Sequence, residues 1–312
     1  MIKSVYDYFE DLDKKNLPRD RHNLIYDGKN ITNVPTMTES GILKHPLMID
    51  GTHYYVKGNN GEYSIVDIAS ANMYNNIGIP TPPIYTIEKE AEGCLKRNVI
   101  SLASQDVRSV KGFLFSIAND LVSQQPMRNL RLFSMYKWSP LYDSDLQKTF
   151  LQHMTKECFD QLVGLFLVDE LRAEHDRHED NYFFYKSKDA DKFEGVMPID
   201  HEMMQVLHFD MRHKGNFDAF LVTPYMTPNM FGSLDNGAYT NRIKDIKELL
   251  QDGMLTPAQI ELMKRAISYN LPKEVKKVGK NPHFKEFKKF AYDATSRLWD
   301  YHQKDLGREL EL

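Results

Sequence analysis

The hydrophobic pattern in the first third of the chain predicts several strands and one helix. The expected strands span residues 31–37, 42–49, 52–57 and 99–103. Asp50-Gly51 separates the second from the third, and this dipeptide between β-favouring runs is typical of a tight hairpin. Apolar residues at helical spacing predict a helix over residues 64–76, which Gly78 and the prolines after it bring to an end. We expect residues 1–30 to contribute a short helix and a loop.

Beyond about residue 106 the pattern is mainly helical. The clearest helix is expected at residues 157–172, where large apolar side chains line one face. A charged loop follows it, then a short strand at residues 182–185 and a second strand, 195–200, that ends at Asp200. Further helices are expected at residues 241–251, 256–270 and 284–301. The pattern predicts an α+β protein with one domain, 1–312, in which residues 1–105 are rich in strands and residues 106–312 are mostly helical.

Composition narrows the class of protein. The 312 residues are 41% hydrophobic and 12% aromatic, which is typical of a folded globule. The net charge of −4 excludes a globally basic nucleic-acid binder, so no DNA partner is expected. Two cysteines, Cys94 and Cys158, are too few for a disulfide framework and predict free thiols in a reducing compartment. We expect no signal peptide and no transmembrane segment, and therefore a cytoplasmic protein. A bacterial effector that is secreted into a host cell is the other location to test.

The charged loop carries the most informative residues of the sequence. It contains Asp176 and, five positions later, Asn181, and Asp200 follows at the end of the next strand but one. Phosphoryl transfer from ATP needs a carboxylate to orient the acceptor hydroxyl and oxygen ligands to hold Mg²⁺ against the phosphates. Asp176 is the candidate for the first role, and Asn181 and Asp200 are the candidates for the second. The sequence therefore predicts a phosphotransfer site in this loop.

The motif Asp-Arg-His-x-x-Asn at residues 176–181 resembles the catalytic loop of the phosphoinositide 3- and 4-kinases. The same arrangement occurs in HipA-like toxins and in compact bacterial effector kinases, which are similar to this chain in size. The resemblance implies a two-lobed protein-kinase-like fold, with a β-rich N-lobe and a mostly helical C-lobe, and it implies ATP and Mg²⁺ as cofactors. Arg177 and His178 would then support the catalytic loop structurally. Residues 199–202, Ile-Asp-His-Glu, stand where these families carry Asp-Phe-Gly, so the behaviour of an activation loop does not follow.

Four further residues fit a nucleotide site on the strand-rich side of such a fold. Lys57 ends the third expected strand, where kinases place the lysine that contacts the ATP phosphates. Asp67 on the following helix is our candidate for its ion-pair partner, and Glu62 just before it is the competitor. The turn that contains Ser40 and Gly41 could cover the phosphates, although an ordinary hairpin turn explains it equally well. We therefore expect Lys57, Asp67, Ser40 and Gly41 to bind ATP.

Other functions fit parts of the same sequence. The acceptor is expected to be a protein Ser or Thr, with a phosphoinositide or small-molecule hydroxyl as the alternative. A pseudokinase that binds a nucleotide or an inositol phosphate without turnover also stays open, because residues 201–202 are His-Glu. His175-Asp176 is a dipeptide of metal-dependent phosphohydrolases, in which case His178, His201 and Glu202 would complete a metal cluster. Transfer of label from γ-labelled ATP separates these classes.

Residues 273–289 contain a cluster of lysines, interleaved with phenylalanines in its second half. The lysines are Lys273, Lys276, Lys277, Lys280, Lys285, Lys288 and Lys289. A solvated helical face is the simplest interpretation of such a pattern. Binding of an inositol polyphosphate or a phosphoinositide headgroup is the alternative. One group of the effector kinases that this chain resembles binds inositol hexakisphosphate, which the resemblance alone extends to this chain.

Overall fold

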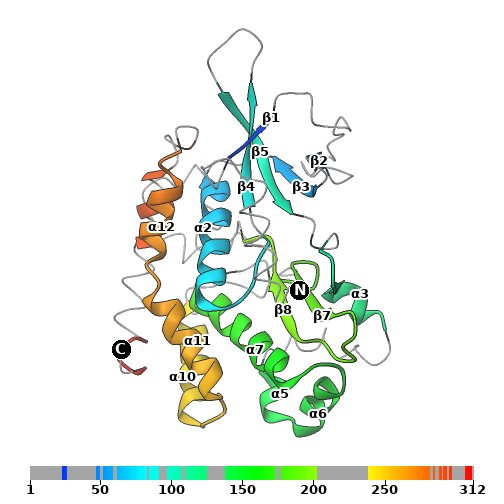
Figure 1. The fold of residues 1–312 in the computed structure, drawn as a ribbon. Helices are drawn as coiled ribbons and strands as arrows, with labels where there is room; N and C mark the ends of the chain where they lie inside the picture. Colours follow the sequence, from blue (N-terminus) through cyan, green and yellow to red (C-terminus); the bar gives the residue numbers. More distant parts are fainter. Residues whose placement is uncertain are drawn as a thin grey trace.

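The computed structural model describes most of the predicted elements. The described residues are 23–26, 47–49, 52–58, 62–82, 84–90, 97–105, 107, 110–124, 138–172, 174, 177–201 and 238–281, with single residues and short runs between 284 and 310. They form a mixed α+β fold, as expected. A five-stranded sheet lies at one end of the molecule, at the top of Figure 1, and helices make up most of the opposite end.

The five-stranded sheet has the strand order β1-β4-β5-β3-β2. Its strands are β1 (Asn23–Tyr26), β2 (Leu47–Ile49), β3 (Thr52–Gly58), β4 (Ile84–Glu90) and β5 (Arg97–Gln105). β2 pairs antiparallel with β3, and Ile49 lies opposite Thr52, so the predicted pairing across Asp50-Gly51 is confirmed. Lys57 is near the end of β3, in register with Leu102 of β5. The strand expected at residues 31–37 lies outside the described residues.

Three strands were not expected from the sequence. β1 forms within the segment predicted as a helix and a loop. It pairs parallel with β4, so that Asn23 lies opposite Thr86, 63 residues later in the chain. β4 follows the prolines that end the preceding helix, and β6 (Phe113–Ile117) lies where helical structure was expected. A short apolar run such as that of β6 fits a strand or a buried helix equally well, so pairing with a partner strand decides the outcome.

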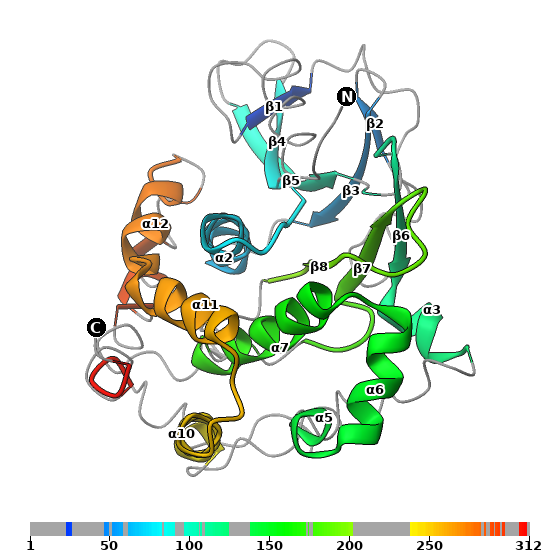
Figure 2. The ribbon, with the colours of Figure 1, turned by 60° about the horizontal axis from the view of Figure 1, so that its bottom comes forward.

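The helix α2 (Glu62–Ile77) confirms the predicted helix and extends it by two residues at its start. Its side chains from Ser64 to Ala71 are all buried, since the sheet, α11 and α12 surround it (Figure 2). Gly78 ends the helix with a φ of 102°, a conformation that glycine adopts without strain. Most of this helix is thus buried between the five-stranded sheet and the helical part.

A second sheet has the order β6-β7-β8 and is antiparallel throughout. β7 (Tyr182–Ser187) and β8 (Gly195–Pro198) confirm the two strands expected after the charged loop, although β8 ends before Asp200. The helix α7 (Lys156–Leu171) confirms the clearest sequence prediction and is buried on all sides from Leu162 to Leu171. The helix α6 (Ser144–His153) packs against α7, α5 (Ser139–Tyr142) packs against α6, and α3 (Ala118–Val122) packs against β6 and β7.

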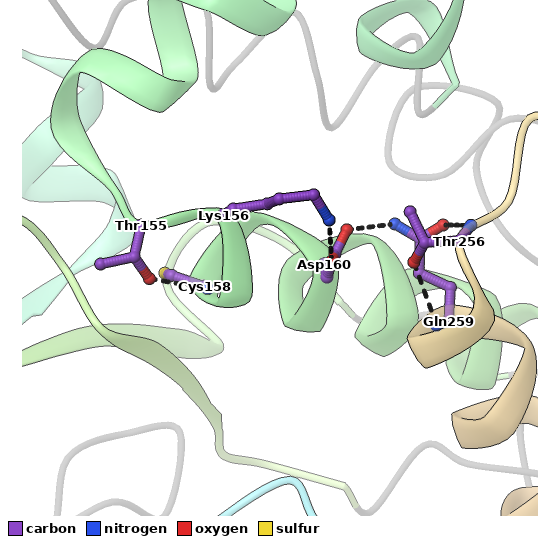
Figure 3. A network of polar contacts seen from close by, with 6 residues as sticks. All are labelled: Thr155, Lys156, Cys158, Asp160, Thr256 and Gln259. Atoms are coloured by element: carbon purple, nitrogen blue, oxygen red, sulfur yellow. Dashed lines mark hydrogen bonds and ion pairs between the residues drawn. The ribbon is translucent and has the colours of Figure 1, made fainter.

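The helices α10 (Ala238–Gln251), α11 (Pro257–Ser268) and α12 (Leu271–Val278) complete the helical part. Figure 3 shows how α11 is fixed to α7: Thr256 caps α11 in a capping box with Gln259, and the Gln259 side chain donates to Asp160 at 3.1 Å. Gly164 faces Leu262 of α11 so closely that a Cβ would collide with it. The expected helices at residues 241–251 and 256–270 are therefore confirmed, and the one at 284–301 lies largely outside the described residues.

The lysine-rich helix α12 packs against α2, far earlier in the chain. The Asn72 amide of α2 donates to the Glu274 carboxylate of α12 at 2.9 Å. Lys273, Lys276, Lys277 and Lys280 are exposed, while Leu271, Val275 and Val278 are buried, so the described lysines form a solvated face. Within the described part of the chain, no helix combines the length and apolarity needed to cross a membrane.

Candidate active site

The ends of β7 and β8 bring two of the predicted metal ligands together. Tyr182 pairs with Pro198 at this edge of the sheet, and the Ile199 amide donates to the carbonyl of Asn181 at 3.0 Å. Asn181 therefore directly precedes one strand, and Asp200 follows the other by two residues. Because the strands are antiparallel neighbours, both residues leave the sheet at the same edge. Asn181 is buried and Asp200 is half-buried.

Asp200 has a left-handed backbone, with φ at 58°. For an L-residue other than glycine this conformation costs roughly 1–2 kcal/mol, although Asp and Asn tolerate it better than most. The expectation that β8 runs through to Asp200 was wrong, because a left-handed residue cannot continue an extended strand. Strain of this kind persists where the surrounding contacts hold it. The contacts that hold Asp200 come from Arg177 and from α2.

The buried guanidinium of Arg177 makes several hydrogen bonds. Its Nη1 donates to the carbonyl of Asn181 at 2.7 Å and to that of Ile199 at 2.6 Å, and its Nε donates to Asp169 at 3.1 Å. Its Nη2 lies 3.0 Å from Nδ1 of His201. One guanidinium therefore fixes both strand ends from which Asn181 and Asp200 emerge. This is the contact set that a supporting role for Arg177 requires.

The charge of Arg177 is balanced within the core by α7 and α2. Asp169 of α7 accepts a bond from Arg177 on one carboxylate oxygen and a short bond from the Tyr74 hydroxyl of α2 on the other. Burial acts to lower the pKa of the Arg177 guanidinium, but Asp169, Tyr74 and Glu174 outweigh it and raise that pKa above its usual value. Burial, followed by the charge of Asp169, raises the pKa of Tyr74 well above 10. Arg177 is therefore a permanent cation and Tyr74 a neutral donor.

His201 closes the network from the other side. A guanidinium has no acceptor, so Nδ1 of His201 accepts the bond from Arg177, and the neutral ring carries its proton on Nε2. The ring packs on Tyr74 with centroids 4.8 Å apart. The backbone amide of His201 donates to Oδ1 of Asp67 in α2 at 2.9 Å, and both residues are buried. His201, the residue after Asp200, is thus bonded to both α2 and Arg177.

The turn between Arg177 and Asn181 is held by local contacts. The Asn181 amide donates to the carbonyl of His178 at 2.9 Å, and Nδ1 of His178 accepts from the amide of Asp180 at 3.2 Å. The Asn119 amide group of α3 donates to Asp180 at 2.8 Å. His178 is half-exposed, in contrast to Arg177, so its contacts shape the turn rather than the core.

Several predicted site residues lie partly or wholly outside the described part. Asp176, Ser40 and Gly41 are outside it. Lys57 is described only as a backbone position of β3, and Glu62 only as the first residue of α2. The pairing of Lys57 with Asp67 or Glu62 therefore stays a prediction. Asp67 is used in a way that the sequence did not indicate, since one of its oxygens accepts from the amide of His201.

Tyr74 and Asp169 are parts of the site that the sequence analysis missed. Asp169 had a visible signal, because it and Glu170 are two adjacent acids near the end of an otherwise apolar stretch, residues 162–171. A carboxylate in such a place needs a buried partner. Tyr74 gave no comparable signal, since an aromatic residue in a buried helix is ordinary core.

The donor set at the strand edge suits a hard cation. Asn181 and Asp200 offer amide and carboxylate oxygens, and Mg²⁺ commonly takes one or two protein ligands together with phosphate oxygens and water. Within the described ranges, no group of three His, Cys, Asp or Glu side chains is arranged to hold a metal ion. Asn181 and Asp200 therefore fit a cation that also takes phosphate oxygens and water as ligands.

Comparison with solved structures shows a likeness in fold. The chain is similar to the crystal structure of the Helicobacter pylori proinflammatory kinase CtkA, with a TM-score of 0.53 and 13% sequence identity. The match covers 93% of this chain and 100% of that chain. At this identity the likeness shows a kinase-like α+β fold. No protein-family model matches the chain, and the search of curated proteins gives no match.

Proposed function

We propose that this protein is an ATP- and Mg²⁺-dependent phosphotransferase with a two-lobed kinase fold. Residues 1–105 would form the N-lobe and residues 106–312 the C-lobe of one domain. The observation that carries the proposal is the convergence of Asn181 and Asp200 at one edge of β7 and β8, directly beside the loop that Arg177 braces. The kinase-like fold supports it independently of these residues.

The residues would divide the work as follows. Asp176 would orient the acceptor hydroxyl, and Asn181 and Asp200 would hold the cation. When bound, Mg²⁺ would offset the negative charge of the phosphates. Lys57, braced by Asp67 or Glu62, would contact the phosphates, and the turn with Ser40 and Gly41 would lie over them. The buried Arg177, whose guanidinium makes four hydrogen bonds within the site, supports this division, because catalysis of phosphoryl transfer depends mainly on fixed positions and charges.

The acceptor class that we propose is a protein Ser or Thr hydroxyl. The resemblance of the motif at residues 176–181 to compact bacterial effector kinases favours it, and it fits a secreted effector as well as a cytoplasmic enzyme. A phosphoinositide or another small hydroxyl compound is the alternative acceptor. The phosphohydrolase reading is weaker, because the Nδ1 atom of His201 accepts a bond from the cationic Arg177 and is buried with it. A cation beside that nitrogen opposes binding of a metal there.

The test is transfer of label from γ-labelled ATP with Mg²⁺, using a protein mixture, phosphoinositide vesicles and a buffer blank as acceptors. Asp200→Asn is the decisive variant, because Asn tolerates the left-handed backbone and removes only the charge. Its label transfer should fall at least several hundred-fold, the approximate scale for one preorganised charge. Asp189→Asn, the same change at an exposed position of the β7–β8 turn, is the matched control and should keep full activity.

Each outcome separates the candidates. Label on protein that depends on Asp200 supports the proposal, and label on lipid alone moves the acceptor to a phosphoinositide. Nucleotide binding without transfer to any acceptor would favour a pseudokinase. Release of phosphate from unrelated phosphoesters, with no need for ATP, would favour a hydrolase. Asp176→Ala should lose transfer and keep nucleotide binding, whereas Asn181→Ala should weaken Mg²⁺–nucleotide binding and recover partly at high Mg²⁺ or with Mn²⁺.

A further inference from the structure

The strained backbone of Asp200 lies between two peptide groups that are each fixed by a hydrogen bond, one partly buried and one buried. On one side, the carbonyl of Ile199 accepts from Nη1 of Arg177 at 2.6 Å. On the other side, the amide of His201 donates to Oδ1 of Asp67 at 2.9 Å. Since φ and ψ of Asp200 are the only soft torsions between these two peptide groups, fixing both groups fixes the residue between them.

The two fixed points differ in origin. Arg177 belongs to the same loop-and-strand unit as Asp200, and Asp169 of α7 and Tyr74 of α2 hold it in turn. Asp67 belongs to α2, 134 residues earlier in the chain. The peptide after Asp200 therefore depends on the position of α2. If that bond were absent, the amide of His201 would lose its described acceptor and Asp200 could relax toward an unstrained φ.

We infer that Asp67 is a positioning residue that holds Asp200 in its left-handed conformation by accepting a hydrogen bond from the backbone amide of His201. As a statement about metal binding, this inference rests on the proposed function, and as a statement about the backbone it does not. The role needs an oxygen acceptor at position 67 and no charge. The role expected from the sequence, an ion pair with Lys57, needs the charge. A carboxylate has two oxygens and can serve both.

The two roles separate in a pair of variants. Asp67→Asn keeps the acceptor and removes the charge, whereas Asp67→Ala removes both. Asn72→Ala is the matched control on the same helix, since it breaks the contact of α2 with Glu274 and leaves position 67 intact. The backbone readout is hydrogen exchange of the Asp200 and His201 amides in the protein without ligands. The functional readout is the Mg²⁺ concentration that half-saturates binding of a non-hydrolysable ATP analogue, measured by calorimetry.

We expect Asp67→Ala to speed exchange of the His201 amide on the order of tenfold or more, as loss of one buried hydrogen bond implies. Asp67→Asn and Asn72→Ala should leave that amide protected. The Mg²⁺ requirement should rise about tenfold in Asp67→Ala, the lower end of the effect of removing a residue that orients a metal ligand. In Asp67→Asn the Mg²⁺ requirement should rise less than in Asp67→Ala, because Asn keeps the acceptor for the His201 amide and removes only the charge that would brace Lys57.

Failures of the two ideas look different. Unchanged exchange of the His201 amide in Asp67→Ala would overturn the inference, and so would equal acceleration in Asp67→Asn and Asp67→Ala. In another outcome, the His201 amide exchanges faster only in Asp67→Ala while the unaltered protein binds no Mg²⁺–nucleotide. That result would support the backbone role of Asp67 and refute the proposed function. If Asp67→Asn raised the Mg²⁺ requirement as much as Asp67→Ala, charge rather than positioning would be the function of Asp67.

Discussion

The helices α2 and α7 are alike in length and burial and differ in how each uses a buried acid. Both have 16 residues, both are largely buried, and both carry an aspartate that is 2% exposed. Asp169 of α7 faces a permanent cation, Arg177, and a phenol that stays neutral. Asp67 of α2 instead accepts from the backbone next to a strained residue. One acid therefore serves mainly the fold, and the other serves mainly the conformation of Asp200.

The two acids differ in the group that would lose its partner if the acid were removed. Among the described residues, Asp169 forms the ion pair with the buried guanidinium of Arg177, and a buried charge that loses its counterion is strongly unfavourable. Without Asp67 one neutral amide loses an acceptor, which costs less. Burial of an acid alone does not identify a site residue; the nature of its partner does.

The largest predicted effect is on stability, at Asp169. Asp169→Ala should lower the free energy of unfolding by about 3–5 kcal/mol, because it removes one partner of a buried ion pair. Asp67→Ala should cost only about 1–3 kcal/mol, the cost of one buried group without its hydrogen bond. Urea unfolding of both variants measures the difference. Equal losses would abolish the distinction between the two helices.

The next effect compares two buried tyrosines. Tyr74 donates to Asp169, whereas the Tyr182 hydroxyl is buried and makes no hydrogen bond with any described residue. Tyr74→Phe should cost about 1.5–3 kcal/mol, as expected for a hydrogen bond to a charged group. Tyr182→Phe should change stability by less than about 1 kcal/mol in either direction. A large loss in Tyr182→Phe would mean that its hydroxyl has a partner that the described residues do not supply.

The same two tyrosines predict how stability depends on pH. Burial, the largest cause in each case, raises the pKa of Tyr74 and of Tyr182 above 10. Above about pH 10 the unfolded chain therefore releases protons that the folded protein keeps, so the free energy of unfolding falls as the pH rises. The stabilising contribution is complete below that pH. Urea unfolding at pH 9, 10 and 11 should show a shallower decline in Tyr182→Phe than in the unaltered protein, and an unchanged slope would contradict the assignment.

The smallest effect is predicted for the lysines of α12. Replacing Lys276, Lys277 and Lys280 together by Ala should change stability by only tenths of a kcal/mol per residue and leave phosphotransfer unchanged, since all three are exposed. The alternative is an anion site. Calorimetric titration with inositol hexakisphosphate at two salt concentrations tests it, and tight, salt-sensitive binding that the triple variant loses would refute a purely solvated face.

The sequence predicted the elements whose own pattern decides their structure. The helices at residues 62–77 and 156–171 and the strands β7 and β8 were of this kind, and so was the neighbourhood of Asn181 and Asp200. β1 and β4 were missed because a parallel pairing between distant segments leaves no local mark. The left-handed backbone of Asp200 was also hidden, since it results from bonds to Arg177 and Asp67 rather than from its neighbours in sequence.

The contact between Asn72 of α2 and Glu274 of α12 bears on the order in which the protein is assembled. The two residues are 202 positions apart, so α12, which packs over α2, is synthesised long after α2 itself. At translation speeds of about 5–20 residues per second, this interval lasts roughly 10–40 s. During that time the apolar face of α2 that α12 will cover is exposed on the nascent chain, and closure of so long a loop makes its burial a late event. Completion of the core around α2 would therefore await release of the C-terminal helices from the ribosome.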